Sequence, residues 1–141
     1  MHTALIQRPT LYFYHYDTGN FIDKCDYINT YNERYDRTLY APFERSITLI
    51  SKVLDDDLIN IIRSSKNIDM YAVFEGINVD ETKQIKVVYK YSNIVIDSIS
   101  YELQNECDMT DFFVNLLALN RVRVSEKELP NKIYQEMKED E

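Results

Sequence analysis

The stretch that decides the fold is DMYAVFEGINVDETKQIKVVYKYSNIVIDSISYEL, residues 69–103. It contains three runs rich in β-branched and aromatic residues, at 69–77, 83–91 and 94–103, separated by the turn-forming stretches NVDET and SN. Runs of this composition, punctuated by Asn, Asp and Ser, are typical of β-strands joined by hairpins. The sequence therefore predicts a three-stranded antiparallel meander over residues 69–103.

The middle run alternates most regularly. Ile85, Val87, Tyr89 and Tyr91 fall on one face of a strand, and the lysines at 86 and 90 fall on the other. This period of two predicts a sheet with one buried and one solvated face. In the third run the alternation changes phase near Asp97 and Ser98, which predicts a β-bulge there.

Helices are predicted on both sides of the meander. An apolar stripe with 4-3-4-4-3 spacing runs through residues 42–67 behind Pro42, a second clear helical pattern begins at Asp108, and a weaker one begins at Asn20. A last helix is expected after Pro130, which suits a first helical position. Further strands are expected at 11–16 and 121–124.

The resulting order is β-α-α-β-β-β-α-β-α. It predicts an α+β fold, in which an antiparallel sheet of about four to five strands, including the strand at 11–16, packs against helices on one face. A length of 141 residues fits a single domain over residues 1–141, with the last five or so residues frayed.

The charge balance restricts the classes of partner. The formal net charge of −8 disfavours nucleic-acid binding and adhesion to anionic membranes. The chain has no apolar run long enough to span a membrane, and its start does not resemble a signal peptide. We therefore expect a complete, cytoplasmic protein. Cys25 and Cys107 have no metal-ligand spacing and are expected to be reduced thiols.

The stretch LYFYHYDTGN, residues 11–20, carries two possible catalytic patterns. Asp17-Thr18-Gly19 is the short signature of aspartic proteases, but Gly76 is the chain's only other glycine and cannot supply both a flap and a bracing strand. The expected structure is a turn with Gly19 at positive φ. His15 and Asp17 could pair as base and orienting acid, so a small metal-independent hydrolase or transferase is one alternative function.

Two acidic clusters do not predict a metal site. Asp55–Asp57 would point in different directions on a helix, and Asp80-Glu81-Thr82-Lys83 falls in a turn, whereas the Glu-x-Lys element of nucleases lies in a buried strand. We expect no cofactor and no metal. The 24 acidic residues are interspersed with 16 basic ones, which also argues against mimicry of DNA.

Tyr12, Tyr14 and Tyr16 share one face of the first predicted strand. The acidic charge opposes base stacking by these rings, which leaves packing against a helix or contact with a protein partner. We predict a non-enzymatic protein-binding protein that uses Tyr12, Tyr14 and Tyr16, and secondarily Asp80 and Glu81 toward a basic partner surface.

An inhibitor, an immunity or counter-defence factor, or an adaptor would fit, from an AT-rich genome such as that of a virus, phage or low-GC bacterium. The second alternative is a structural subunit of a larger assembly, and a homo-oligomer is compatible with either.

Overall fold

The computed structural model describes residues 3–5, 8–40, 42–80, 82–102 and 111–139. Within these residues, strands dominate and form two antiparallel sheets. The first sheet has the order β10-β7-β6-β2-β3, with β1 paired to the far end of β6. Its strands are β1 (Thr3–Leu5), β2 (Thr10–His15), β3 (Phe21–Cys25), β6 (Ile68–Asn78), β7 (Lys83–Ser92) and β10 (Asn120–Val124).

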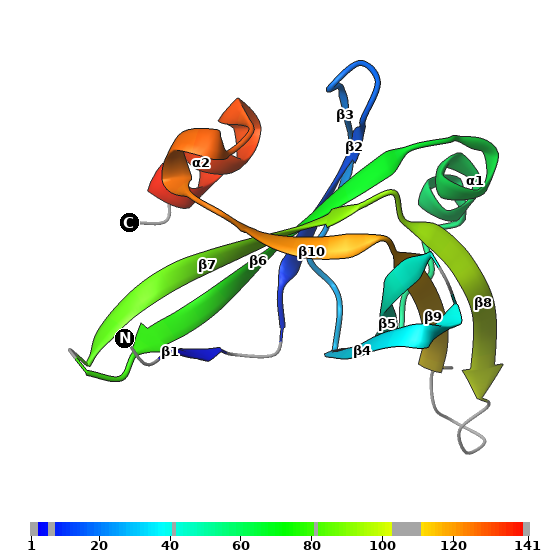
Figure 1. Ribbon diagram of the computed structural model, residues 1–141, viewed down its shortest axis with the longest axis horizontal. Coiled ribbons are helices and arrows are strands. Elements are labelled where there is room, and N and C mark those ends of the chain that lie inside the picture. Colours follow the sequence, from blue (N-terminus) through cyan, green and yellow to red (C-terminus); the bar gives the residue numbers. More distant parts are fainter. Residues whose placement is uncertain (1–2, 6–7, 41, 81, 103–110, 140–141) are drawn as a thin grey trace.

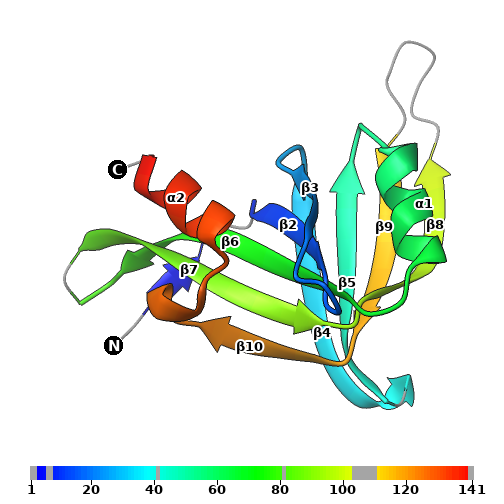
Figure 2. The same cartoon turned by 90° about the horizontal axis from the view of Figure 1, so that it is seen from above.

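The second sheet has the order β4-β5-β9-β8. Its strands are β4 (Thr30–Tyr40), β5 (Phe43–Ser51), β8 (Val95–Glu102) and β9 (Asp111–Ala118). Figures 1 and 2 show that the two sheets cross each other, and that the β6–β7 hairpin extends well beyond the crossing.

The main core lies between the two sheets. Leu11, Phe13 and Met70 of the first sheet pack with Ile47 and Leu116 of the second. The helix α1 (Asp56–Ser64) adds Leu58 and Ile62 to this core. The second helix, α2 (Asn131–Glu139), follows the 3-10 turn η1 (Glu126–Glu128) and lies on the opposite face of the first sheet (Figure 1).

The prediction of an α+β fold is wrong, because strands form in three of the segments that were predicted to be helices. Residues 20–35 form β3 and the start of β4, where Tyr31 is buried, Asn32 exposed and Glu33 half-buried in strand alternation. Asn, Thr and Tyr are frequent here and have poor helix propensity, so pairing with β2 and β5 determines the local structure.

The apolar stripe at 42–67 divides into β5 and the shorter helix α1. Ile47, Leu49 and Ser51 are buried on alternate positions of β5, which pairs with strands on both sides. β5 has Ile47 and Leu49 on one face and Ile50 on the other, and such a short apolar run can imitate a helical spacing. The helix begins only after Asp55, whose side chain accepts a hydrogen bond from the Leu58 amide at 3.1 Å.

The predicted helix from Asp108 is also replaced by a strand. Residues 111–118 form β9, whose Phe112, Phe113 and Val114 favour extended backbone, and it pairs with both β5 and β8. The expected capping residue Asp108 lies outside the described residues.

The three strands of the meander form, but they do not belong to one sheet. β6 pairs with β7, whereas β8 pairs with β9 in the second sheet. The stretch at Ser92–Asn93 is a crossover, because Ile94 is buried and its amide donates to the Ile68 carbonyl at 2.8 Å. Of the two turn residues only Asn93 has positive φ, so a type I′ hairpin turn is not formed.

Several local predictions are confirmed. β2 matches the strand at 11–16 and pairs with β6, while a register shift between Ile96 and Ser98 is the expected bulge. Gly19 has a φ of 72°, as the turn requires. The predicted strand at 121–124 and the helix after Pro130 are present as β10 and α2. α2 extends to Glu139, and the last two residues lie outside the described ones.

Candidate binding surfaces

The tyrosines of β2 lie under the helix α2. Tyr12 and Tyr14 form a small apolar cluster with Tyr71, Val88 and Ile133, and we call the sheet part of this cluster the tyrosine face. Ile133 of α2 is fully buried against it. Tyr16 lies beyond the strand end and is 64% exposed. A partner could therefore contact Tyr16 directly, but could contact Tyr12 and Tyr14 only where α2 is displaced.

Glu136 connects α2 to the first sheet. Its carboxylate lies 2.6 Å from the Lys24 ammonium and 3.5 Å from that of Lys132, and accepts a hydrogen bond of 3.4 Å from the Tyr12 hydroxyl. Partial burial opposes the charged form of Glu136. Its hydrogen bond and attraction to Lys24 outweigh this effect and lower the pKa of its carboxyl, and Lys132 contributes in the same direction. The same hydrogen bond raises the pKa of Lys24.

Tyr14 is held by ring contacts. Its ring meets Phe21 and Tyr71 edge to face, with centroids 5.5 Å apart in each pair, and its buried hydroxyl has no hydrogen-bond partner among the described residues. Burial, together with the neighbouring Tyr71, raises the pKa of Tyr14 to about 12. This side chain therefore stabilises the packing of α2 through its ring and not through its hydroxyl.

The alternative catalytic pair is not assembled. His15 is half-buried at the end of β2, Asp17 is exposed in the turn, and no hydrogen bond joins their side chains. Asp80 is exposed at the β6–β7 turn, where its amide donates to the Asn78 side chain at 3.2 Å, and Glu81 lies outside the described residues. Asp80 thus lies in the turn between β6 and β7, beyond the strand residues Tyr71 and Val88 of the tyrosine face.

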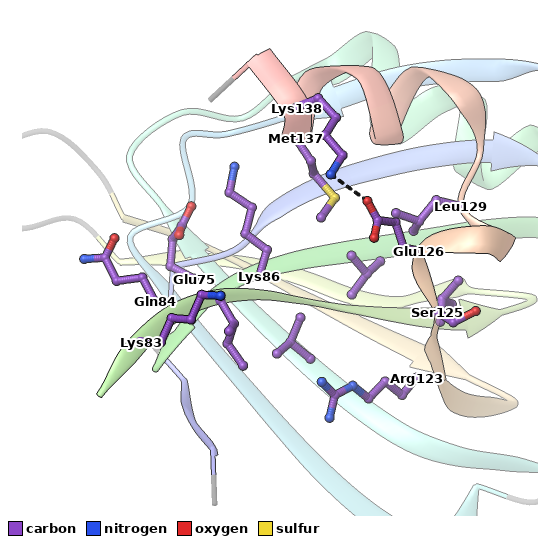
Figure 3. Close-up of a pocket in the computed structure, with 14 residues that line it drawn as sticks. Glu75, Lys83, Gln84, Lys86, Arg123, Ser125, Glu126, Leu129, Met137 and Lys138 are labelled. Carbon is purple, nitrogen blue, oxygen red and sulfur yellow. Dashed lines mark ion pairs between the residues drawn. The ribbon is translucent and has the colours of Figure 1, made fainter. Parts of the chain in front are cut away.

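A groove of about 950 Å³ lies where β10 ends and the chain turns away into η1. Its lining comes from β7, β10, η1 and α2, as Figure 3 shows: Lys83, Gln84, Ile85, Lys86, Val87, Val88, Arg123, Val124, Ser125, Glu126, Leu129, Met137 and Lys138, with Glu75 of β6. Lys138 and Glu126 form an ion pair of 2.8 Å across its rim. No pattern in the sequence predicted this groove, although the strand alternation noted there includes Ile85, Lys86 and Val87.

A polar cluster joins the two sheets near β10. The Tyr91 hydroxyl donates to the Glu33 carboxylate, which also lies 3.0 Å from the Arg45 guanidinium and 3.4 Å from that of Arg121. Burial raises the pKa of Tyr91, and the charge of Glu33 raises it further. No local motif signals this cluster, because its members come from β4, β5, β7 and β10.

Comparisons with known proteins identify solved structures with a similar fold. No family model matches the sequence, and no curated protein matches it. Among solved structures, a chain of the SPP1 tail tube superposes with a TM-score of 0.58 at 10% identity, covering 95% of this chain and 85% of that one. A chain of the sixfold-symmetrised anti-feeding prophage baseplate superposes with a TM-score of 0.51 at 9% identity, covering 86% and 95%.

The chain therefore shares the fold of a tail-tube protein and a baseplate protein over most of its length. In the part of the chain that the structure describes, neither helix has the length and apolar character needed to cross a membrane.

Proposed function

We propose that this chain is a structural, non-enzymatic subunit of a larger protein assembly of the phage-tail type. The observation that carries the proposal is the fold match, because it spans nearly the whole chain in both comparisons and both matched chains belong to multi-protein assemblies. At 9–10% identity the match supports a shared architecture, and the assembly role is our inference from it.

The distribution of apolar side chains supports the same proposal. The β6–β7 hairpin protrudes from the crossing of the sheets (Figure 2), and near its tip Ile77 and Val79 are 41% and 53% exposed. Apolar side chains at the end of a protruding hairpin lose contact with water when a neighbouring subunit packs on them. We expect the hairpin tip to contact another subunit.

Open strand edges support it as well. The first sheet ends at β3 on one side, and the second ends at β4 and β8, with no further strand among the described residues beside them. Edges of this kind are surfaces for association between chains. Protein partners and a homo-oligomer follow from this proposal, whereas an inhibitor, immunity or adaptor role stays a prediction from the sequence.

Sedimentation velocity over a wide range of protein concentration, with negative-stain electron microscopy of the same samples, tests the proposal. We expect discrete oligomers, rings or tubes to appear as the concentration rises. A chain that stays a monodisperse monomer up to its solubility limit would contradict self-assembly.

A further inference from the structure

The edge of β7 is covered along only part of its length. β10 pairs with β7 from Val88 to Ser92, and β6 pairs with β7 from Lys83 to Tyr91. Beyond Val124 the chain leaves the sheet for η1, so no strand of the described chain continues β10 beside residues 83–87. We propose that this open edge binds an extended acidic segment of a partner protein as an added β-strand. The proposal concerns a site on the single chain and does not require self-assembly.

The groove described above surrounds this edge. Successive residues of a strand point to opposite faces, so Lys86 and Val88 point to the α2 side, and Val87 and Ile85 point to the other side. All four side chains nevertheless line the same groove. A single groove can be lined from both faces of a sheet only where it passes around the edge of that sheet. The groove and the open backbone edge are therefore one site (Figure 3).

The length of the edge fits a short extended segment. A strand opposite residues 83–87 would span roughly 16 Å, at about 3.3 Å per residue. It would lie antiparallel to β7, in line with β10, and its backbone would bond to β7 as β10 does. Side chains on its α2-facing side would meet Leu129 and Met137, which favours apolar residues at alternate positions.

The charges of the site favour acidic residues at the other positions. Lys83 and Arg123 both point away from α2, because they share a face with Ile85 and Tyr89. No carboxylate of the described chain lies within ion-pair distance of either of these two cations, and both are exposed (Figure 3). In a chain with a net charge of −8, two such cations flanking an open edge provide local complementarity to a negative segment.

Amide hydrogen exchange and NMR of the dilute, isotope-labelled chain test this proposal with two synthetic peptides. One peptide alternates glutamate with valine, and the other alternates lysine with valine. We expect the glutamate peptide to bind saturably and to slow exchange within residues 83–87, and we expect the lysine peptide not to bind. Equal binding of both peptides, no binding of the glutamate peptide, or protection at another strand would overturn the proposal.

Charge reversal separates this site from general attraction. We expect the double variant Lys83→Glu/Arg123→Glu to weaken binding of the glutamate peptide about tenfold, since two exposed ion pairs contribute modestly. Lys66→Glu/Lys127→Glu reverses two exposed charges outside the groove and is expected to leave the affinity unchanged. Equal weakening by both double variants would argue against the site. Concentration-dependent protection of residues 83–87 without peptide would instead assign the edge to a second copy.

Discussion

The Tyr91 hydroxyl donates a hydrogen bond to the Glu33 carboxylate, and this bond joins β7 of the first sheet to β4 of the second. Glu33 is also the common ion-pair partner of Arg45 and Arg121, and its side chain is only 12% exposed. One carboxylate thus accepts a hydrogen bond from a hydroxyl and forms ion pairs with two guanidinium groups at the place where the sheets cross.

Replacing this carboxylate should destabilise the fold. We expect Glu33→Gln to lower the free energy of unfolding by about 2–3 kcal/mol, because two partly buried arginines lose their countercharge. Urea denaturation monitored by circular dichroism measures the change. Glu75→Gln, an exposed glutamate on β6, is the matched control and should change stability by less than about 0.5 kcal/mol. Similar values for the two variants would show that the cluster contributes little.

The docking of α2 depends on one buried side chain. Ile133→Ala removes the fully buried contact of the helix with the tyrosine face, and such truncations cost about 2–5 kcal/mol in a packed site. We expect faster amide exchange throughout α2 and greater exposure of Tyr12 and Tyr14. Gln135→Ala, at an exposed position of the same helix, should leave exchange unchanged. Unchanged exchange in Ile133→Ala would mean that other contacts hold the helix.

Acid should release α2 through Glu136. Because the pKa of Glu136 is lowered in the folded chain, its contribution to stability is present above the ordinary value of 4.5 and is lost as the pH falls from there through the folded pKa. We expect tyrosine fluorescence and α2 exchange to report undocking in that acidic window. Glu136→Gln should weaken the pH dependence, whereas Glu139→Gln, which is exposed, should not.

Tyr14 should make the fold sensitive to alkali. Its pKa rises from 10.0 to about 12 on folding, so the stability that it contributes is present below pH 10 and is lost as the pH rises toward 12. We expect Tyr14→Phe to be nearly neutral at pH 7, since the lost hydroxyl has no partner in the described chain, and to resist unfolding above pH 10 better than the unmodified chain. Thermal melts at the two pH values measure this difference.

The hairpin tip should control association. We expect the double variant Ile77→Ser/Val79→Ser to lower the tendency to self-associate in sedimentation velocity while the melting temperature stays within a few degrees, because both side chains are largely exposed. Val53→Ser, an exposed valine in the segment between β5 and α1, is the control. An equal loss of association in both variants would show that the hairpin tip is not the interface.

Strands with regular alternation could be predicted from the sequence. β2, β6, β7, β8 and β10 carry period-two patterns, and their positions were found. β5 and β9 could not be distinguished from helices, because each contains a short run of adjacent apolar residues whose spacing is compatible with either a strand or a helix. The division into two sheets was also missed, since the pairing of β8 with β9 depends on contacts that no local pattern encodes.

The candidate site shows the same limit. The tyrosine alternation of β2 was visible, but its cover by α2 depends on residues 133 and 136, more than a hundred positions away. The open edge of β7 follows from the place where β10 stops pairing, which is a property of the three-dimensional ladder and not of either strand alone. The sequence therefore predicted Tyr12, Tyr14 and Tyr16, with Asp80 and Glu81, as binding residues, but it did not predict the open edge of β7.

The pairing of β5 with β9 has a consequence for how the chain acquires its structure. Arg45 lies opposite Ala118, so the second sheet joins the first third of the chain to the last third. Local helices and hairpins can form early, but closing such a distant pair is slow because a long loop must first be restrained. During synthesis, β5 cannot pair with β9 until β9 has emerged from the ribosome. Until then the edge of β5 that pairs with β9 stays open, and open strand edges are prone to association with other chains.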